Sequence, residues 1–544
     1  MTPSRLAVAT SAGILYRRCL QAVKIDRQLS SFLIESRSQR ATVRPIGPDN
    51  SRALAFSCII GHCEAKPREA DMSDKMEQLY QERFRRYVTA MRNEKPDRVP
   101  IRPFVAEFTA RYAGYTAQQV THDYEIAFAA ARKCAADFDW DAVVSNMVYV
   151  WTGLTQAIGL KYYGVPGIDL PPEVGFQYRE PPADQAWMRA DEYDQLIDDP
   201  TGFLFNVWLP RVSADVVAPG SPNTYRNNLS FLKGGMAMLQ YFNSFGRQVA
   251  LLHSESGTVS AIAGILKAPF DIIADKLRGY VGLTMDMVEQ PDKVLAACEA
   301  LAPHLLNVAL GTADPDRSVP VGFWMHRGCV PFITPGQFKS HFWSTLKPII
   351  EGLWVNGVQT LFYAEGNWDR HLDSFAELPD RSIVYHVDRG DIFEAHRKLG
   401  HKFCLSGGIP NYLLSFGTAD EVRQRCKKVI DGVAQDGGYI MDASAIMQND
   451  TNPENLRAMT EFTREYGVYS GAATGIPDAP ASRSSGSAFP PAPHPRAKPG
   501  VCIPWEEKLK ELSGISGDPE IAKRIWEGTD GLANMYIWQC LLSF

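Results

Sequence analysis

Short apolar runs recur along the chain, and most of them end in a polar or ionisable residue. Each run has about the length of a buried β-strand. The runs are Val99–Phe104, Trp140–Met147, Gln248–Ser256, Val319–Arg327, Val358–Glu365, Ser382–Asp388, Lys402–Gly408 and Gly438–Ser444. The pattern therefore predicts eight buried strands.

The segments between these runs mostly carry helical periodicity, as in residues 418–435 and 453–466. Strands that alternate with helices form parallel sheets, because the helix returns the chain to the same edge of the sheet. Eight such units predict an α/β protein, a (β/α)8 TIM barrel. In that fold the residues at the carboxyl ends of the strands face the substrate.

The predicted strand ends collect polar side chains at one rim of the barrel. These are Asn146, Ser254, Glu255, His326, Arg327, Glu365, Asp388, Ser406 and Asp442. The long βα insertion at 171–243 is rich in aromatic and acidic residues. Long loops in compact domains tend to be functional, which favours a partly helical cap over the rim. The alternative is an excursion that only extends the core.

The barrel pattern occupies residues 72–470, and the flanking parts differ from it. Residues 1–71 form an atypical Arg- and Ser-rich extension, which is either an organelle leader or an upstream extension of the true start. Residues 471–500 form a linker rich in Pro, Ser and Ala that we expect to be disordered. Residues 501–544 form a helical tail with tryptophan anchors that docks on the barrel or on a partner.

Composition narrows the function classes. The net charge of −6 gives no basic surface for nucleic acid, and no apolar run reaches the roughly 18 to 20 residues that span a membrane. The ten cysteines are scattered without a CxxC pair, which favours reduced thiols and a cytoplasmic location. The phosphate-binding patterns GxGxxG and GxxxxGK[ST] are absent, so no nucleotide cofactor is indicated.

His326 and Arg327 end the strand VPVGFWMHRG. A histidine at a strand end is a candidate general base, metal ligand or anion contact. The alternative is a structural histidine that bonds a neighbouring loop, and the sequence does not choose between them.

Two further strands end in carboxylates. Glu365 closes LFYAEGNWD, where Asn367 either binds substrate or caps the next helix together with Asp369. His386 and Asp388 lie two residues apart and therefore on one face of their strand. A carboxylate near an imidazole has a shifted pKa, which acid and base catalysis uses.

The last two strands end in KFCLSGGIPN and GYIMDASAI. Their rim positions are Ser406, Gly407, Gly408 and Asp442. Two glycines at a late barrel strand suit a phosphate or carboxylate contact through backbone amides. The predicted catalytic residues are thus His326, Glu365, His386, Asp388 and Asp442, and the predicted substrate contacts are Asn146, Arg327, Asn367, Ser406, Gly407 and Gly408.

Several of these segments resemble the superfamily of uroporphyrinogen decarboxylase and the corrinoid-dependent methyltransferases. The resemblance covers about residues 76–467. It rests on NEKPDRVPI, on DWDAVVSNMVYVWTGLTQAIG, and above all on SGGIPNYLLSFGTADEVRQRCKKVI followed by GGYIMDASAIMQNDTNPENLRAM. It implies a TIM barrel that acts on a small molecule.

The chain departs from both parent mechanisms at particular residues. The essential aspartate of the decarboxylase falls on Asn146, and its arginine-rich substrate segment retains only Arg102 and Arg111 nearby. The methyltransferases hold zinc with a His-x-Cys pair and a later Cys, which here fall on Tyr363 with Glu365 and on Ser444 or Ala445. A divalent metal such as zinc would then need carboxylate and imidazole ligands, and a metal-free acid and base site fits equally.

The resemblance implies three functions, of which the first is preferred. The first is corrinoid-associated methyl transfer, as in demethylation of a small methoxylated substrate, with the corrinoid on a separate protein because no DxHxxG motif is present. The second is decarboxylation of uroporphyrinogen or another carboxylated substrate by a lyase. The third is a catalytically inactive binding subunit.

Overall fold

A computed structural model describes residues 67–144, 152–471 and 489–542 of the chain. The chain divides into two compact units, Met1–Lys75 and Met76–Phe544. Of the first unit, the described residues form the beginning of helix α2 (Pro67–Met91). Every described strand belongs to the second unit, which also contains all of the predicted site residues.

The largest sheet has six parallel strands in the order β10-β9-β8-β7-β6-β5. Each strand after β5 comes from the next βα unit along the chain, so neighbours in sequence are neighbours in the sheet. The central strands are buried along their full length, as expected for a sheet that is covered on both faces. The strands are β5 (Gly264–Leu266), β6 (Val321–Met325), β7 (Thr360–Ala364), β8 (Ile383–Val387), β9 (Cys404–Gly407) and β10 (Tyr439–Ile440).

Backbone contacts continue beyond the β10 edge of this sheet. The Met441 amide donates to the Pro100 carbonyl at 2.8 Å, and the Val144 amide donates to the Pro103 carbonyl at 3.0 Å. Next to these residues, β1 (Ala142–Val143) pairs in parallel with β4 (Val259–Ser260). A small antiparallel pair, β2 (Tyr163–Gly164) with β3 (Gln177–Tyr178), lies apart from them. The protein is therefore α/β with parallel sheets.

The prediction of a strand at 248–256 is wrong, because this segment ends helix α10 (Tyr225–Ser256). Its buried positions Gln248, Leu252 and Ser256 are spaced by four residues, which is the helical and not the strand period. Gly257 ends the helix with φ +60°, the left-handed conformation that favours glycine at this place. The strand follows at β4 and β5, so Ser254 and Glu255 belong to a helix, where Glu255 pairs with Arg132.

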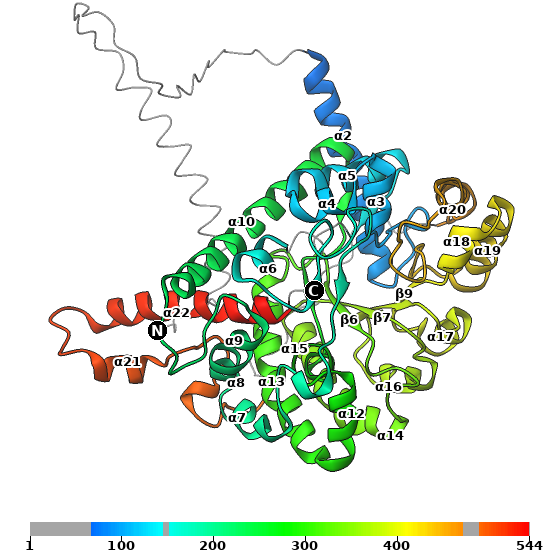
Figure 1. Cartoon of the computed structure of the whole chain (residues 1–544). Coiled ribbons are helices and arrows are strands. Elements are labelled where there is room, and N and C mark those ends of the chain that lie inside the picture. The colour runs from blue at the N-terminus through cyan, green and yellow to red at the C-terminus, as the bar shows by residue number, and fades with distance from the viewer. Residues whose placement is uncertain (1–66, 145–151, 472–488, 543–544) are drawn as a thin grey trace, which may run out of the picture. The chain divides into compact units, whose positions relative to one another are not determined.

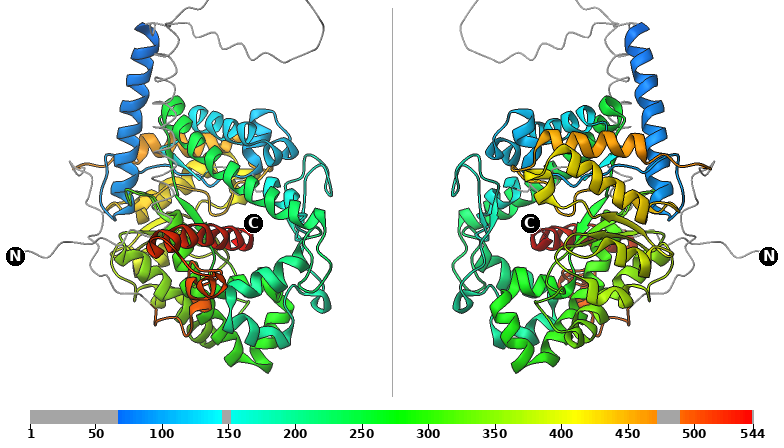
Figure 2. Two further views of the ribbon diagram at one scale, coloured as in Figure 1. Left: turned by 90° about the vertical axis from the view of Figure 1, so that its left-hand side faces the viewer. Right: turned by 90° about the vertical axis from the view of Figure 1, so that its right-hand side faces the viewer.

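Helices cover the sheets and follow the strands in turn (Figure 1). Before β4 they are α3 (Glu107–Ala113), α4 (Ala117–His122), α5 (Tyr124–Asp137), α6 (Thr152–Ile158), α7 (Tyr193–Asp198), α8 (Pro200–Phe203), η4 (Leu204–Trp208), α9 (Leu209–Val212) and α10. After β5 they are α11 (Pro269–Ile272), η5 (Ile273–Leu277), α12 (Tyr280–Glu289), α13 (Pro291–Thr312), α14 (Pro335–Gln337), η6 (Phe338–Trp343), α15 (Ser344–Val355), α16 (Leu372–Phe375), α17 (Ile392–Leu399), α18 (Asn411–Phe416), α19 (Ala419–Val433) and α20 (Pro453–Tyr466). The predicted helices at 418–435 and 453–466 correspond to α19 and α20, which lie side by side (Figure 2).

The tail forms α21 (Trp505–Glu511) and a long α22 (Pro519–Leu542), drawn orange and red in Figure 1. The end of α22 packs on the same unit, because Trp538 stacks on His304 at 4.7 Å and its indole donates to Thr201. Of the two possibilities for the tail, the structure shows docking on its own chain.

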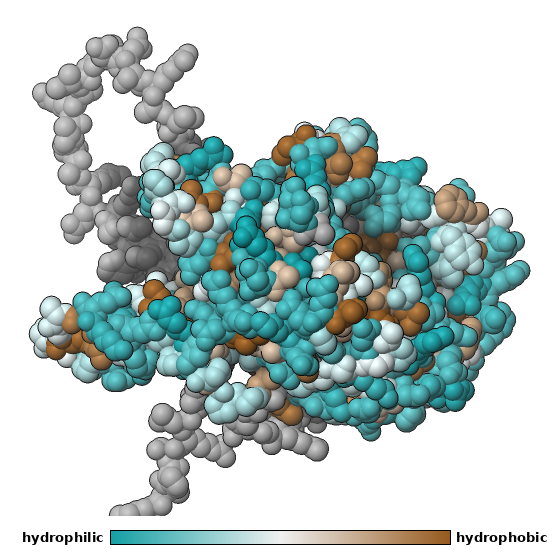
Figure 3. Space-filling model, turned by 60° about the horizontal axis from the view of Figure 1, so that its bottom comes forward, coloured by the Kyte–Doolittle hydropathy of each residue, from teal (hydrophilic) through white to brown (hydrophobic). Residues whose placement is uncertain are grey.

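One described helix, α13, is long and apolar enough to cross a membrane by length and composition. About half of its most apolar window, 56%, is buried against the rest of the chain, and it packs on α7, α11 and α15. This is the environment of a core helix. On the face shown in Figure 3 the surface is mainly hydrophilic, with hydrophobic side chains in separate patches.

Candidate functional site

A group of charged side chains lies beyond the carboxyl ends of β5 and β6. His326 directly follows β6, and Asp271 and Asp275 lie on the helical segment that follows β5. The two aspartates are four residues apart and so project from one side of their helix. Ligand atoms of Asp271, Asp275 and His326 all lie within 4.8 Å of one another.

Asp275 is the most heavily bonded member of this group. It pairs with Lys267 at 2.7 Å, with Arg327 at 2.8 Å and with the Nε2 atom of His326 at 2.9 Å. Burial alone would raise the pKa of Asp275, but His326 and Lys267 hold it well below its usual value. Asp275 is therefore a carboxylate whose charge is already compensated.

Asp271 has no exposed surface, and its Oδ1 atom accepts the backbone amides of His326 and Arg327 at 3.0 and 3.1 Å. Burial raises the pKa of Asp271. The imidazole of His326 lies between the two aspartates, and its Nδ1 atom is 3.7 Å from Asp271. Burial would lower the pKa of His326, but the contact with Asp275 outweighs it and the pKa is raised.

Two more carboxylates continue the arrangement along the next strand ends. Glu365 follows β7, is 48% exposed at its side chain, and lies 3.9 Å from Nδ1 of His326. Asp388 follows β8 and accepts the Gly366 amide at 2.8 Å. Burial raises the pKa of Asp388 to about 6, and the nearby charge of Glu365 acts in the same direction. We call Asp271, Asp275, His326, Glu365 and Asp388 the rim cluster.

A second polar group lies deeper between the strands and has no exposed surface. It consists of Arg102, His386, Ser406 and Asp442, which we call the interior network. Arg102 donates to Ser406 at 2.9 Å and pairs with Asp442 at 3.3 Å. His386 is 3.8 Å from Asp442 and stacks on Tyr363.

The hydrogen bonds of the interior network fix where its protons lie. Nε2 of His386 faces the Ser444 carbonyl at 2.9 Å, so this nitrogen carries the hydrogen. Ser406 accepts from Arg102 and therefore donates to Nδ1 of His386 at 2.9 Å. Burial and then the charge of Arg102 lower the pKa of His386 to about 3. Burial raises the pKa of Asp442 to about 7 against the opposing charge of Arg102.

The predicted site residues thus separate into two groups. His326, Arg327, Glu365 and Asp388 come together at the rim, and His386, Ser406 and Asp442 lie in the interior network. The hydroxyl of Ser406 is used within the protein, which gives it a structural role where we predicted a substrate contact. Asn146 lies outside the described residues.

The loop residues predicted to bind substrate have structural contacts. Asn367 accepts the Asp369 amide at 3.1 Å, a local turn contact, and its side chain does not cap the helical turn Asp369–His371. The Gly408 amide donates to the Val387 carbonyl at 3.3 Å. Gly407 has φ +87°, and a Cβ atom there would lie 2.4 Å from the Val387 carbonyl oxygen. Gly407 therefore allows the close approach of β9 to β8, and the anion contact of the two glycines stays a prediction.

The thiolate ligands of the zinc-dependent methyltransferases have no counterpart here. The resemblance places their positions on Tyr363, Glu365 and Ser444 or Ala445, none of which is a cysteine. Tyr363 is buried and Ser444 offers its carbonyl to His386, so neither presents an ionised ligand. A thiolate zinc site does not fit these residues.

The sequence analysis missed Asp271, Asp275 and Lys267, which take part in most of the ion pairs at the rim. The reason is the misplaced third strand, because a strand at 248–256 leaves its end at Ser254 and Glu255. The missed signal is KAPFDIIAD, in which Lys267 follows β5 and two aspartates recur four residues apart.

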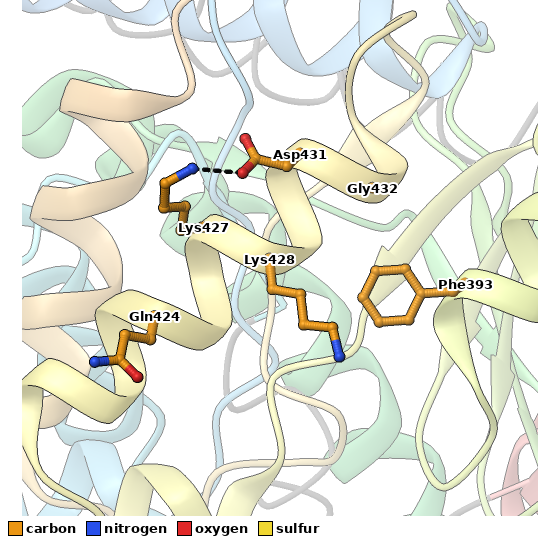
Figure 4. Close-up of a pocket in the computed structure, with 6 residues that line it drawn as sticks. All are labelled: Phe393, Gln424, Lys427, Lys428, Asp431 and Gly432. Atoms are coloured by element: carbon orange, nitrogen blue, oxygen red, sulfur yellow. Dashed lines mark hydrogen bonds and ion pairs between the residues drawn. The ribbon is translucent and has the colours of Figure 1, made fainter.

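A separate surface depression lies between α17 and α19, on the outside of the sheet (Figure 4). Its volume is about 480 Å³, and it is lined by Phe393, Gln424, Lys427, Lys428, Asp431 and Gly432. Lys428 stands over the Phe393 ring and Lys427 pairs with Asp431. The depression is wide open and holds none of the strand-end residues, so we do not assign the chemistry to it.

Comparisons with known proteins address the fold. No curated protein matches the chain. Among solved structures, a methyltransferase from Methanosarcina mazei superposes with a TM-score of 0.49 at 14% identity, over 70% of this chain and 98% of that one. The family model described as uroporphyrinogen decarboxylase (URO-D) matches residues 234–466, which include β4 to β10, the rim cluster and, apart from Arg102, the interior network. This match confirms, for residues 234–466, the predicted resemblance to the superfamily of uroporphyrinogen decarboxylase.

Proposed function

We propose that the chain is an enzyme of this superfamily that removes a methyl group from an oxygen atom of a small substrate. The methyl acceptor in this proposal is a corrinoid on a separate protein. The observation that carries the proposal is the placement of Asp388, a carboxyl with a pKa of about 6, beside Glu365 at neighbouring strand ends. In this class of fold, the carboxyl ends of the strands are where substrates bind.

Asp388 supplies what demethylation of an ether oxygen requires. When the carbon–oxygen bond breaks, the methyl carbon passes to the acceptor and the electron pair stays on the substrate oxygen. That oxygen needs a proton, and a carboxylic acid with a pKa near 6 is still partly protonated near neutral pH. Glu365, half exposed at the same mouth, repels a second negative charge and so keeps the proton on Asp388.

The proposal gives the interior network a positioning role. Its members have no exposed surface, and His386 is held neutral by its surroundings. Arg102 and Asp442 compensate each other's charge between the strands. We therefore place the chemistry at the rim cluster and expect the interior network to hold β8, β9 and β10 in register beneath it.

We further infer that the parallel strands close into the eight-stranded barrel. The support comes from residues near Ile101, which bridge to Met441 on one side and, at Phe104, to Val144 on the other. β4 and β5 follow each other closely and pair with β1 and β6 respectively. The cytoplasmic location and the separate corrinoid-binding partner remain parts of the same proposal.

A decarboxylase reaction is the second candidate. It is favoured by the family model itself and by Arg102, whose Nε and Nη1 atoms have no hydrogen-bond partner among the described residues. Such a guanidinium suits a substrate carboxylate. Its complete burial beside Asp442 is the reason that we rank this reaction second.

The two reactions are separated by their products. The full-length protein is incubated with reduced cobalamin and a set of methoxylated benzenes and benzoates, and separately with uroporphyrinogen. We expect methylcobalamin and the matching phenol to form in the first incubation, and no carbon dioxide in the second. Carbon dioxide without methyl transfer would replace the proposal with the decarboxylase, and neither product would favour the inactive binding subunit.

A further inference from the structure

The charged contacts around His326 differ sharply between its two ring nitrogens. Nε2 is bonded to Asp275, whose charge Lys267 and Arg327 already compensate. Nδ1 has no hydrogen-bond partner among the described residues, although the nearest carboxylates are Asp271 at 3.7 Å and Glu365 at 3.9 Å. Nε2 is therefore oriented by Asp275, while Nδ1 has no hydrogen bond within the described residues and lies near Asp271 and Glu365.

Asp271 shows the same incomplete bonding. Its Oδ1 atom accepts two backbone amides, while its Oδ2 atom is buried with no hydrogen-bond partner in the described part of the chain. Leaving a buried polar atom unsatisfied costs about 1 to 3 kcal/mol, and more for a charged one. A carboxylate oxygen and an imidazole nitrogen that both lack a hydrogen-bond partner at the same strand ends are suitable donors for a cation.

Charge also favours a cation at this place. Asp271, Asp275 and Glu365 carry three negative charges when ionised, and Lys267 and Arg327 supply two positive ones. Both positive side chains are bonded to Asp275, and the imidazole of His326 is the basic group within 4 Å of Asp271 and Glu365. Asp275 therefore orients the imidazole, and Asp271 and Glu365 face its other nitrogen, where a metal would bind.

We propose that Nδ1 of His326 and the Asp271 carboxylate bind one divalent cation of the zinc type, with Glu365 as the third, movable ligand. Imidazole and carboxylate together are a common donor set for zinc and similar ions. Asp275 takes the place of the carboxylate that accepts the other ring N–H of a metal-bound histidine. The half-exposed side chain of Glu365 leaves an open route from solvent to the cation.

This site goes beyond the proposed function, because metal binding does not depend on which reaction the chain catalyses. It also replaces the thiolate set of the related methyltransferases with oxygen and nitrogen ligands. A cation at Nδ1 of His326 would lie beside the same mouth as Asp388, where it could polarise a substrate oxygen.

The test measures metal binding in the absence of any substrate. Full-length protein is stripped with chelator and titrated with ZnCl2 by calorimetry, and Co²⁺ is added in parallel to record its visible spectrum. We expect one zinc per chain and a Co²⁺ spectrum typical of low coordination number. His326→Gln and Asp271→Asn should each abolish stoichiometric binding, and Asp275→Asn should weaken it about 10- to 100-fold.

Two matched variants serve as controls. Asp388→Asn removes a nearby carboxylate that is not a proposed ligand, and Cys329→Ser removes a nearby thiol that donates to the His326 carbonyl. Both should keep full binding. Asp271→Asn can still accept the two backbone amides, so it remains informative if His326→Gln does not fold. Absence of stoichiometric zinc on the wild-type protein, or equal binding by Asp271→Asn, overturns the site.

Discussion

The rim cluster and the interior network contain the same kinds of side chain but differ in their access to solvent. Each has a histidine within 4 Å of a carboxylate, and each joins several strands of the sheet. In the interior network the imidazole has a hydrogen-bond partner at both nitrogens, and nothing is exposed. At the rim one nitrogen and one carboxylate oxygen are bare, and Glu365 opens to solvent. Arg102 and Asp442 also carry atoms without a hydrogen-bond partner among the described residues, but these atoms are sealed from solvent, so the rim is where such atoms are available to a substrate or a metal.

The largest expected effect is on catalysis at the rim. Asp388→Asn should reduce kcat/KM for methyl transfer about 100- to 10,000-fold, because the amide cannot give a proton to the leaving oxygen. The wild-type rate should fall as pH rises through about 6, since the general acid then loses its proton. The pH–rate profile of the variant should lack that step, and an unchanged profile would remove Asp388 from the mechanism.

Substitutions in the interior network should lower the free energy of unfolding. Arg102→Met leaves Asp442 buried without its cation and should lower the free energy of unfolding by about 3 to 5 kcal/mol. Urea denaturation measures this. The matched control is Arg423→Met, which breaks an exposed pair with Asp420 and should cost less than about 1 kcal/mol. Equal losses in both variants would show that Arg102 and Asp442 are not a structural pair.

The two titrating members of the interior network should give opposite pH dependences. The pKa of His386 is about 3 in the fold against about 6.5 unfolded, so its burial removes stability as pH falls below 6.5. The pKa of Asp442 is about 7 in the fold against about 3.9 unfolded, so it adds stability as pH falls from about 7 to 4.

Variants separate these two effects. Between pH 7 and 5, Asp442→Asn should become less stable by about 2 kcal/mol and His386→Asn more stable by about the same amount, each relative to its own value at pH 7. Urea midpoints at the two pH values report the slopes. Slopes of the same sign would mean that one of the two groups is not buried as described.

The smallest effect distinguishes a turn residue from a substrate contact at the rim. Asn367→Ala removes the hydrogen bond from the Asp369 amide and should cost about 0.5 to 1.5 kcal/mol of stability. KM should stay within twofold of wild type. A large rise in KM at unchanged stability would restore the substrate contact that the sequence suggested.

Most of the predicted strands lie at about their observed places, because each is a short apolar run of about the length of a buried strand. The run Val99–Phe104 forms isolated parallel bridges rather than a continuous strand. Where residues follow the strands, as with His326, Glu365 and Asp388, their gathering at one rim followed from the parallel arrangement. The run at 248–256 failed because a helix covered on one side can carry consecutive apolar residues near its end, and Gly257 was the local sign of that end.

The sequence could not predict which of these residues lie at the rim and which lie in the interior network. His386 and Asp388 share a face of one strand. The structure shows that both ring nitrogens of His386 are hydrogen-bonded, to Ser406 and Ser444. Asp388 follows the strand and accepts the Gly366 amide. Which nitrogen of His326 is bare depends on Asp275, which lies 51 residues away in the chain. Burial and long-range pairing decide such roles, and neither is a property of a local motif.

The central claim is that substrate meets the rim cluster and leaves the interior network untouched. A crystal structure of the full chain with the phenol product bound tests it directly. The account predicts the product hydroxyl within about 3.2 Å of the Asp388 carboxyl, with Arg102 and Asp442 still paired to each other. A product whose oxygen or carboxylate contacts Arg102, Asp442 or His386 instead would contradict it.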